Sequence, residues 1–314
     1  MGEQRSTRAL SDGERKKIGS CGRVSYERGM KFRLLPTAIL LGFFQATLSA
    51  ENIEAPGNNF DQPLIEAAGE KPLCLDVSTG YDSRYMFRGV NVLPNTGIIW
   101  ASVAPSWNIT PHDSLTVPFW YTTAVGKTAE GVNQNYREFD VPVNYTHTIG
   151  NLTIGASYLL YTYFNLDGVQ PGGTAVQNEI ALNTSYTVKT GGVSWVPSLS
   201  WYYELGTPNG YSYGSVNPGS SFLSPELTVN IPIYKDRISF NPATQYNFSF
   251  GYNADQDGNY VWGGNNWQLM APLTWQINKT ISVAGYVAYS YQWQNLAGTS
   301  PGTCWAGGNL TFSF

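Results

Sequence analysis

The sequence lacks long apolar runs, and charged residues make up only 13% of it. After position 50 no apolar stretch reaches the roughly 18 residues that a membrane-spanning helix needs. Membrane-spanning β-strands are not excluded, because such a strand is apolar only at every second position. Residues 1–50 carry nine Lys and Arg against four Asp and Glu, and residues 51–314 carry nine against eighteen. The acidic balance of the longer part argues against nucleic-acid binding, which needs a basic surface.

Histidine and cysteine are also scarce, with two and three residues. A serine hydrolase uses a histidine as its base, but His112 and His147 fall in or beside short predicted turns. No Cys and His pair has zinc-ligand spacing, so we expect no enzyme, no cofactor and no such metal centre. Cys21 precedes the predicted mature chain. Cys74 and Cys304 fall near opposite ends of the first and last predicted strands, about 20 Å apart at ~3.4 Å per residue, which is too far for a disulfide.

Residues 1–50 predict an export leader. Residues 30–50 have a basic start, a short apolar middle and small residues at the end, which is the pattern of a secretory signal peptide. Residues 1–29 are either a long basic extension of that signal or lie upstream of a true start at Met30, and we favour the second. Residues 51–72 are acidic and contain prolines, which predicts a periplasmic lead-in, with a plug as the alternative.

From position 73 onward, apolar and polar residues alternate with period two, which predicts strands with two different faces. For example, Leu182 and Tyr186 oppose Asn183 and Ser185. An even number of strands is typical of single-chain bacterial barrels. We count twelve segments, at residues 73–89, 97–108, 114–123, 136–146, 151–163, 178–188, 193–204, 222–233, 237–251, 267–277, 280–293 and 303–314.

The connections between these segments alternate in length. Short turns are predicted at residues 110–113, 148–150, 189–192, 234–236 and 278–279. Longer polar loops are predicted at residues 124–135, 164–177, 205–221, 253–266 and 294–302. Short turns on one side and long loops on the other are typical of an outer-membrane barrel with both termini in the periplasm. The sequence therefore predicts an all-β, transmembrane, antiparallel barrel over residues 73–314, closed by its first and last strands.

The last segment carries the most specific single pattern. Leu310, Phe312 and Phe314 share one face and the sequence ends on the phenylalanine. A terminal aromatic preceded by alternating apolar residues resembles the signal that the barrel-assembly machinery recognises in outer-membrane proteins. These three residues are our predicted assembly signal, and that machinery is a predicted partner.

Aromatic residues gather near strand ends on the apolar face. Amphipathic rings prefer the headgroup level of a membrane, so two bands of them predict the girdles of a barrel in contact with lipid. The alternative is an aromatic core or carbohydrate-binding face in a soluble protein. The residues concerned are Trp107, Tyr121, Tyr145, Trp195, Trp201, Tyr203, Trp267, Trp275, Tyr291 and Trp293.

One stretch resembles a known family. Residues 83–90, Ser-Arg-Tyr-Met-Phe-Arg-Gly-Val, are similar to a motif of the bacterial family Gcw_chp, and Glu138-Phe139-Asp140 followed by Tyr145 is similar to that family's middle region. The resemblance covers about residues 73–190 of this sequence. It implies an exported, barrel-forming protein of unknown function and brings no catalytic residues with it.

The polar face of the predicted strands carries the candidate lumen residues. They are Asp76, Asp82, Arg84, Arg88, Glu138, Asp140, Glu179, Glu204 and Glu226. We expect Arg84 and Arg88 to pair with Glu138 or Asp140 through bidentate contacts. Two readings stay open for these charges, a structural network that fills a narrow barrel and a constriction that selects solutes by charge. The excess of carboxylates would favour cations or neutral polar solutes.

A second, weaker motif lies near residue 255. Asn253, Asp255 and Asp257, with Gly258 after them, resemble the first half of a calcium loop. The position where such a loop needs a bidentate glutamate is Gly264. A plain polar turn is the alternative and the one we favour, so we predict no metal here.

The sequence thus predicts a protein of the bacterial outer membrane that is exported by a signal peptide. The favoured function is a narrow, porin-like channel for small polar or cationic solutes. One alternative is a structural or surface-interaction barrel with a blocked lumen, whose longer loops make the contacts. The other is a secreted, soluble β protein.

Overall fold

The computed structural model describes most of the chain after residue 71. The predicted leader, the predicted lead-in and parts of the longer predicted loops lie outside the described residues. Among the described residues, no helix has the length and hydropathy to cross a membrane. The described ranges are 72–93, 96–125, 136–164, 174–206, 217–235, 237–255, 257–294 and 302–314.

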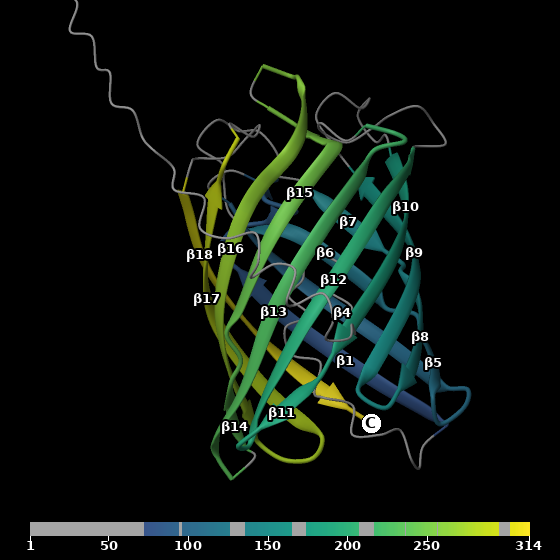
Figure 1. Ribbon diagram of the computed structural model, residues 1–314, viewed down its shortest axis with the longest axis vertical. Helices are drawn as coiled ribbons and strands as arrows, with labels where there is room; N and C mark the ends of the chain where they lie inside the picture. The colour runs from purple at the N-terminus through teal and green to yellow at the C-terminus, as the bar shows by residue number, and fades with distance from the viewer. Residues whose placement is uncertain are drawn as a thin grey trace, which may run out of the picture. The chain divides into compact units, whose positions relative to one another are not determined.

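The wall is a closed barrel of twelve antiparallel strands (Figure 1), as the alternation predicted. It closes because β1 (Leu73–Asp82) pairs with β18 (Gly302–Ser313) on one side and with β4 (Gly97–Asn108) on the other. The other wall strands are β5 (Asp113–Thr116) with β6 (Phe119–Val125), β7 (Arg137–Asp140) with β8 (Val143–Ile149), β9 (Leu152–Phe164), β10 (Thr174–Tyr186) with β11 (Val188–Thr190), β12 (Val193–Gly206), β13 (Ser221–Tyr234), β14 (Ile238–Phe240) with β15 (Ala243–Ala254), β16 (Tyr260–Gln276) and β17 (Ile281–Gln292).

Proline explains three of the four interrupted wall strands. Pro118 separates β5 from β6, Pro142 separates β7 from β8, and Pro242 separates β14 from β15. A proline has no N–H to donate to a neighbouring strand, so the ladder breaks locally. Backbone bonds continue on either side of each break. The Val117 N–H, for instance, donates to the Pro105 carbonyl at 3.1 Å, so the strand keeps its place in the wall.

Two strands begin at least four residues earlier than the sequence predicted. β10 begins at Thr174 rather than 178, and β16 begins at Tyr260 rather than 267. Part of the loop predicted at residues 253–266 is therefore strand. The pairing of β15 with β16 shifts register after Asn247 and again after Phe250. These irregularities interrupt the period-two pattern on which the prediction depended.

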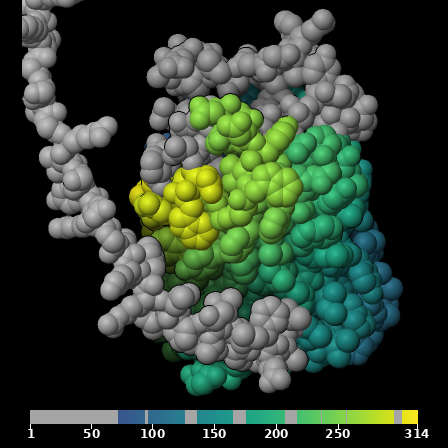
Figure 2. Space-filling model, turned by 45° about the horizontal axis from the view of Figure 1, so that its top comes forward, coloured from purple at the N-terminus to yellow at the C-terminus, as the bar shows by residue number. Residues whose placement is uncertain are grey.

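The outer surface of the wall is apolar. Val103, Leu182 and Val287 point outward and are between 42% and 62% exposed. Seen from outside, the side chains of neighbouring strands form a continuous covering (Figure 2). A soluble monomer rarely exposes large contiguous apolar patches, so the soluble alternative was wrong. A band of this kind faces lipid in a transmembrane barrel.

Aromatic side chains lie outward near both ends of the wall. We call the end with the short turns, where the chain also ends (Figure 1), the turn end, and the opposite end the loop end. Trp107 pairs with Leu73 near the turn end, and Tyr291 pairs with Gly302 near the loop end. The predicted aromatics that are at least 40% exposed are Trp107, Tyr121, Tyr145, Trp195, Trp275, Tyr291 and Trp293.

The largest departure from the prediction is the end of the first strand. A continuous strand over residues 73–89 was wrong, because β1 ends at Asp82 and the chain then turns into the barrel. We call residues 83–93 the inward segment. It contains a small separate hairpin of β2 (Met86–Phe87) and β3 (Val90–Asn91). Arg88 and Gly89 form its tip with φ of 45° and 85°, the left-handed backbone that a two-residue hairpin turn requires.

Candidate functional site

The inward segment crosses the lumen from one side of the wall to the other. At its start, the Ser83 N–H donates to the Ala306 carbonyl at 2.8 Å, and the Ala306 N–H donates to the Ser83 hydroxyl at 2.9 Å. These bonds anchor it to β18. At its tip, Arg88 reaches Glu179 on β10, which is separated from β18 by β12, β13, β15, β16 and β17 in the wall. The segment therefore spans the lumen near the loop end.

Arg88 forms a bidentate ion pair with Glu179. Its Nη1 and Nη2 atoms lie 2.5 Å from the two carboxylate oxygens. The guanidinium carbon also lies 3.7 Å from the ring centroid of Tyr202 and 4.9 Å from that of Tyr252. Stacking on aromatic faces and bidentate bonding to a carboxylate are both favourable for arginine. The tip of the inward segment is thus held by a carboxylate on β10 and by rings on β12 and β15.

Wall amides bind the backbone of the same tip. The side-chain amides of Asn253 and Asn265 both donate to the Arg88 carbonyl at 3.1 Å. The Gln292 side-chain amide donates to the Gly89 carbonyl at 2.6 Å. A hairpin of two-residue strands leaves many carbonyls unpaired, and a buried carbonyl needs a donor. The wall supplies these donors from β15, β16 and β17.

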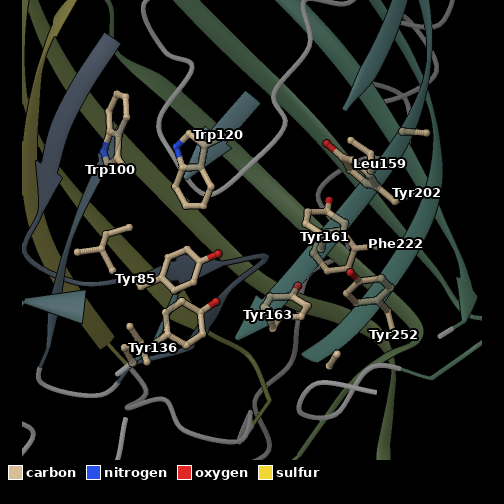
Figure 3. Packing of buried hydrophobic residues seen from close by; sticks show 14 residues of the cluster. Tyr85, Trp100, Trp120, Tyr136, Leu159, Tyr161, Tyr163, Tyr202, Phe222 and Tyr252 are labelled. Atoms are coloured by element: carbon tan, nitrogen blue, oxygen red, sulfur yellow. The ribbon is translucent and has the colours of Figure 1, made fainter. Parts of the chain in front are cut away.

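Glu138 and Asp140 form a second polar centre, on β7. The hydroxyls of Tyr85 and Tyr136 both donate to Glu138 Oε2. Figure 3 shows these two tyrosines side by side, and Tyr161 and Tyr163 lie on β9, the strand that pairs with β7. Glu138 and Asp140 are at most 1% exposed. Within the described part of the chain, Glu138 Oε1 and both oxygens of Asp140 have no hydrogen-bond partner.

Glu204 extends the network around Arg88. The Gln177 amide donates to Glu204 Oε2 at 2.8 Å and to Glu179 Oε1 at 3.3 Å. The Gly206 N–H donates to Glu204 Oε1 at 2.9 Å. All three polar side chains are buried, so they connect β10 and β12 through bonds that point into the lumen.

The other predicted lumen carboxylates lie apart from these two centres. Asp82, at the end of β1, accepts a hydrogen bond from the Tyr286 hydroxyl. Glu226 accepts one from the Thr228 hydroxyl at 2.7 Å. Asp76 is only half-buried. The residues at these positions share the inward face of the wall without forming one cluster.

Short hydroxyl side chains line the lumen nearer the turn end. They pair across neighbouring strands and stay partly exposed. Asp76 is the one predicted lumen carboxylate among them. The pairs, with their oxygen–oxygen distances, are Ser78 and Thr311 at 3.0 Å, Ser106 and Thr116 at 2.7 Å, and Ser114 and Thr146 at 2.6 Å.

The expected partners of the two arginines were wrong. Arg84 lies at the start of the inward segment, where its Nε donates to the Cys304 carbonyl at 3.2 Å. Arg88 does make a bidentate contact, but with Glu179 rather than with Glu138 or Asp140. The prediction assumed that the first strand continues to residue 89, which would place both arginines in the wall. The chain instead turns inward after Asp82, so both arginines lie away from those positions.

The calcium motif is divided between two environments. Asn253 is buried and its amide donates to Arg88, whereas Asp255 lies in the turn between β15 and β16. There the backbone N–H groups of Asp257 and Asn259 donate to Asp255 Oδ1 at 3.0 and 2.8 Å. Among the described residues, no group of three or more His, Cys, Asp or Glu side chains is arranged to hold a metal.

The two histidines lie at the turn end. His147 Nδ1 lies 2.7 Å from Asp113 Oδ1, and the ring centroids of His112 and His147 are 6.4 Å apart. Asp113 also accepts a hydrogen bond from the Tyr145 hydroxyl at 2.6 Å. The cluster joins β5 to β8 and is far along both strands from the lumen carboxylates.

The predicted assembly signal lies on the outward face of β18. Leu310 and Phe312 are half-buried, and Phe314 is exposed. Cys304 is exposed on the same face, and Cys74 on β1 is half-buried. Both are free cysteines.

Sequence reasoning missed the aromatic side chains inside the barrel. The expected lumen was polar, yet large rings are buried there together with the carboxylates. A signal was present, because Tyr202 lies two residues from Glu204, and Tyr136 two residues from Glu138, so the period-two pattern puts each ring on the face of its carboxylate. The missed residues are Tyr85, Trp100, Trp120, Tyr136, Tyr161, Tyr163, Tyr202, Phe222 and Tyr252.

Comparison with known proteins identifies the fold. No family model matches the chain, and no curated protein matches it. Among solved structures, the COG4313 outer membrane channel from Pseudomonas putida F1 is similar, with a TM-score of 0.53 and 11% identity over 80% of this chain and 99% of that chain. The NanC porin has a TM-score of 0.44 and 14% identity, over 76% and 98%. LpxR from Salmonella typhimurium has 0.45 and 8%, over 76% and 99%.

At these identities the comparisons support the fold alone. Of the three structures named, the Pseudomonas putida channel has a TM-score above 0.5. Its coverage extends over nearly the whole of that channel. Together with the closed wall and the exposed apolar band, it shows that this chain has the fold of an outer-membrane β-barrel.

Proposed function

We propose that this chain forms a narrow channel in the bacterial outer membrane for small polar and cationic solutes, and that the inward segment closes it. The observation that carries the proposal is the charge of the inner surface. Seven carboxylates lie on the inward face of the described wall strands, and one of them, Glu179, is paired with the Arg88 guanidinium of the inward segment. They are Asp76, Asp82, Glu138, Asp140, Glu179, Glu204 and Glu226.

An acidic lumen favours cations for two reasons. Low-dielectric walls focus the field of like charges and raise the local concentration of counterions. Carboxylates around a constriction also replace part of the water that a cation loses on entry. Toward the turn end, the partly exposed Ser and Thr side chains offer both donors and acceptors, which suits neutral polar solutes as well. Nothing in this arrangement favours an anion.

The inward segment explains how such a channel would be closed. Tyr85 and Leu93 are at most 2% exposed, so the segment packs closely inside the lumen in this conformation. The segment is not part of the wall ladder, however. Its β2 and β3 pair only with each other, and side-chain contacts hold it to the lumen. Opening therefore requires the loss of those contacts and no rearrangement of the wall.

The test is single-channel recording of the refolded chain, residues 51–314, in a planar bilayer. We expect discrete conductance steps with a cation preference. The double variant Glu138→Gln with Asp140→Asn should weaken that preference, because it removes two charges from the lumen. Asp257→Asn is the matched control, since it removes one charge from an exposed turn. Unchanged selectivity in the double variant would mean that these charges do not act on the permeating ion.

A second function is favoured by the burial of the inward segment. A lumen that stays closed would leave a structural or surface-interaction barrel, which acts through its loops. Complete silence in the bilayer, from protein whose folding is shown by heat-dependent gel mobility, would support this function and reject the channel.

A further inference from the structure

The buried carboxylates of the lumen lack enough positive charge. Six are less than 9% exposed, namely Asp82, Glu138, Asp140, Glu179, Glu204 and Glu226. Nη1 and Nη2 of Arg88 each donate to one carboxylate oxygen of Glu179, so the charge of Arg88 is paired with that residue. The Lys and Arg side chains of the described wall and turns, Arg137, Lys189, Lys235, Arg237 and Lys279, are exposed and cannot neutralise a carboxylate inside the barrel. Arg84, at the start of the inward segment, donates instead to the Cys304 carbonyl at an exposed site.

The shortage of positive charge is greatest at Glu138 and Asp140. These residues are two apart on β7, so both side chains point into the lumen. Within the described part of the chain, no donor reaches Glu138 Oε1 or either carboxylate oxygen of Asp140. Ionised carboxylates are acceptors only, so a buried pair of them requires a proton or a cation. Burying a carboxylate without either costs several kcal/mol.

Aromatic rings surround this pair. Asp140 lies opposite Trp120 on β6 and opposite Tyr161 on β9, so the two rings flank it on the inner surface. The Tyr85 ring lies 6.4 Å from the Trp120 ring and 5.7 Å from the Tyr136 ring, between centroids. The negative faces of such rings attract cations, above all desolvated organic ones.

We propose that Glu138 and Asp140 bind the primary ammonium group of a small organic cation. Such a group has three N–H donors and no acceptor. The pair offers three oxygens without a hydrogen-bond partner, Glu138 Oε1 and both oxygens of Asp140. The fourth oxygen, Glu138 Oε2, is already occupied by two tyrosine hydroxyls. Donors and acceptors therefore match in number.

The same surroundings disfavour a metal ion. Calcium and magnesium require six or more oxygen ligands, several of them carboxylates, carbonyls or waters. Here rings take the places where further oxygen ligands would stand. The proposal rests on the proposed function in that the cation would be a solute of the lumen, but its binding does not require conduction.

Binding can be measured by isothermal titration calorimetry on the refolded chain in detergent at neutral pH. The probe is propylammonium chloride. We expect saturable binding, with tetramethylammonium at least about tenfold weaker, because it fits the rings but has no N–H to donate to the carboxylates. Sodium chloride at equal ionic strength should give no saturable heat. No saturable binding of propylammonium would overturn the proposal and mean that a shared proton neutralises the pair.

Matched variants locate the site. Asp140→Asn should weaken propylammonium binding at least about tenfold, since a charge-assisted hydrogen bond is lost. Glu226→Gln should bind as the wild type does, although Glu226 is also a buried lumen carboxylate. Wild-type affinity in Asp140→Asn would overturn the proposal. Gel mobility checks folding, and Glu138→Gln carries the same expectation if Asp140→Asn does not fold.

The two proposals fail separately. Propylammonium binding without conductance would reject the channel and leave the site in place. Conductance with no propylammonium binding would reject the site and leave the channel.

Discussion

The two halves of the lumen are built differently although one wall forms both. Toward the loop end, the interior contains a folded segment of chain, an ion pair and many large rings, nearly all buried. Toward the turn end, it is lined by Ser and Thr side chains that remain partly exposed and bond to their neighbours on adjacent strands. The outer surface shows no such change and is apolar along the wall.

The wall therefore closes in the same way around two different interiors. The inter-strand ladder holds the wall at both ends, as in membrane barrels in general. A barrel of about twelve strands has room inside for more than wall side chains. The inward segment occupies that room toward the loop end, and small polar side chains line it toward the turn end. Variants in the two halves should therefore behave differently.

The largest effect is expected from Arg88→Ala. The change leaves Glu179 buried without its partner, which costs about 3–5 kcal/mol in comparable buried pairs. We expect the inward segment to leave the lumen, with faster hydrogen–deuterium exchange over residues 83–93 and a higher open probability in the bilayer. The wall should keep its heat-dependent gel mobility.

Arg84→Ala is the control for that variant. Arg84 belongs to the same segment, and its described hydrogen bond is to a backbone carbonyl at an exposed site. We expect exchange and open probability close to those of the wild type. Equal effects from the two arginine variants would mean that the Arg88 ion pair does not hold the segment.

A smaller effect is expected from Gly89→Ala at the tip of the hairpin. A Cβ there would clash with Asn266 Oδ1, on a backbone with φ of 85°. Crowding and left-handed strain together should cost about 1–3 kcal/mol, seen as faster exchange over residues 83–93. Gly150 is the control position, because it also has a positive φ, of 62°, but a Cβ there would meet no atom within 4 Å. Gly150→Ala should change hydrogen–deuterium exchange only at its own turn. Faster exchange over residues 83–93 in this variant would contradict the view that the effect of Gly89→Ala is local to the hairpin tip.

Thr116→Val tests the turn-end half. The variant keeps the shape of the side chain and removes its hydrogen bond to Ser106. Such a bond between partly exposed hydroxyls contributes roughly 0.5–1.5 kcal/mol, so we expect a slight loss of thermal stability. Open probability should not change. An increase like that of Arg88→Ala would break the distinction between the two halves.

The smallest effect concerns a region outside the lumen, the turn after β15. Hydrogen bonds from the Asn259 and Asp257 backbone lower the pKa of Asp255 below its usual value. A group with a lowered folded-state pKa stabilises the turn above its unfolded pKa of about 3.9 and loses that effect as pH falls further. Amide exchange at Asn259, corrected for the intrinsic rate, should therefore rise only in acid. In Asp255→Asn this acid dependence should vanish.

The wall could be predicted because its signal is local. Leu182 and Asn183 point to opposite faces for a reason that needs no partner, since successive residues of a strand alternate. The same rule put Glu138, Glu179 and Glu204 on the inner face, where they lie. The rule also puts aromatic residues such as Tyr202 on the inner face. They were missed because a water-filled lumen was expected.

The inward segment could not be predicted in this way. Residues 83–89 continue the alternation of β1, and nothing in their pattern marks the exit at Asp82 except the Arg88-Gly89 pair. That pair is compatible with a turn but does not require one. The decision depends on partners far away in the sequence, including Glu179, Asn253 and Gln292.

An antiparallel barrel with an apolar outside and an acidic inside follows from the sequence, because period-two alternation needs only the geometry of a strand. Which carboxylate binds Arg88, and which ones lack a counter-charge, depends on the side chains that meet across the lumen once the wall has closed. The place of the inward segment and the ammonium site that we propose both depend on those contacts.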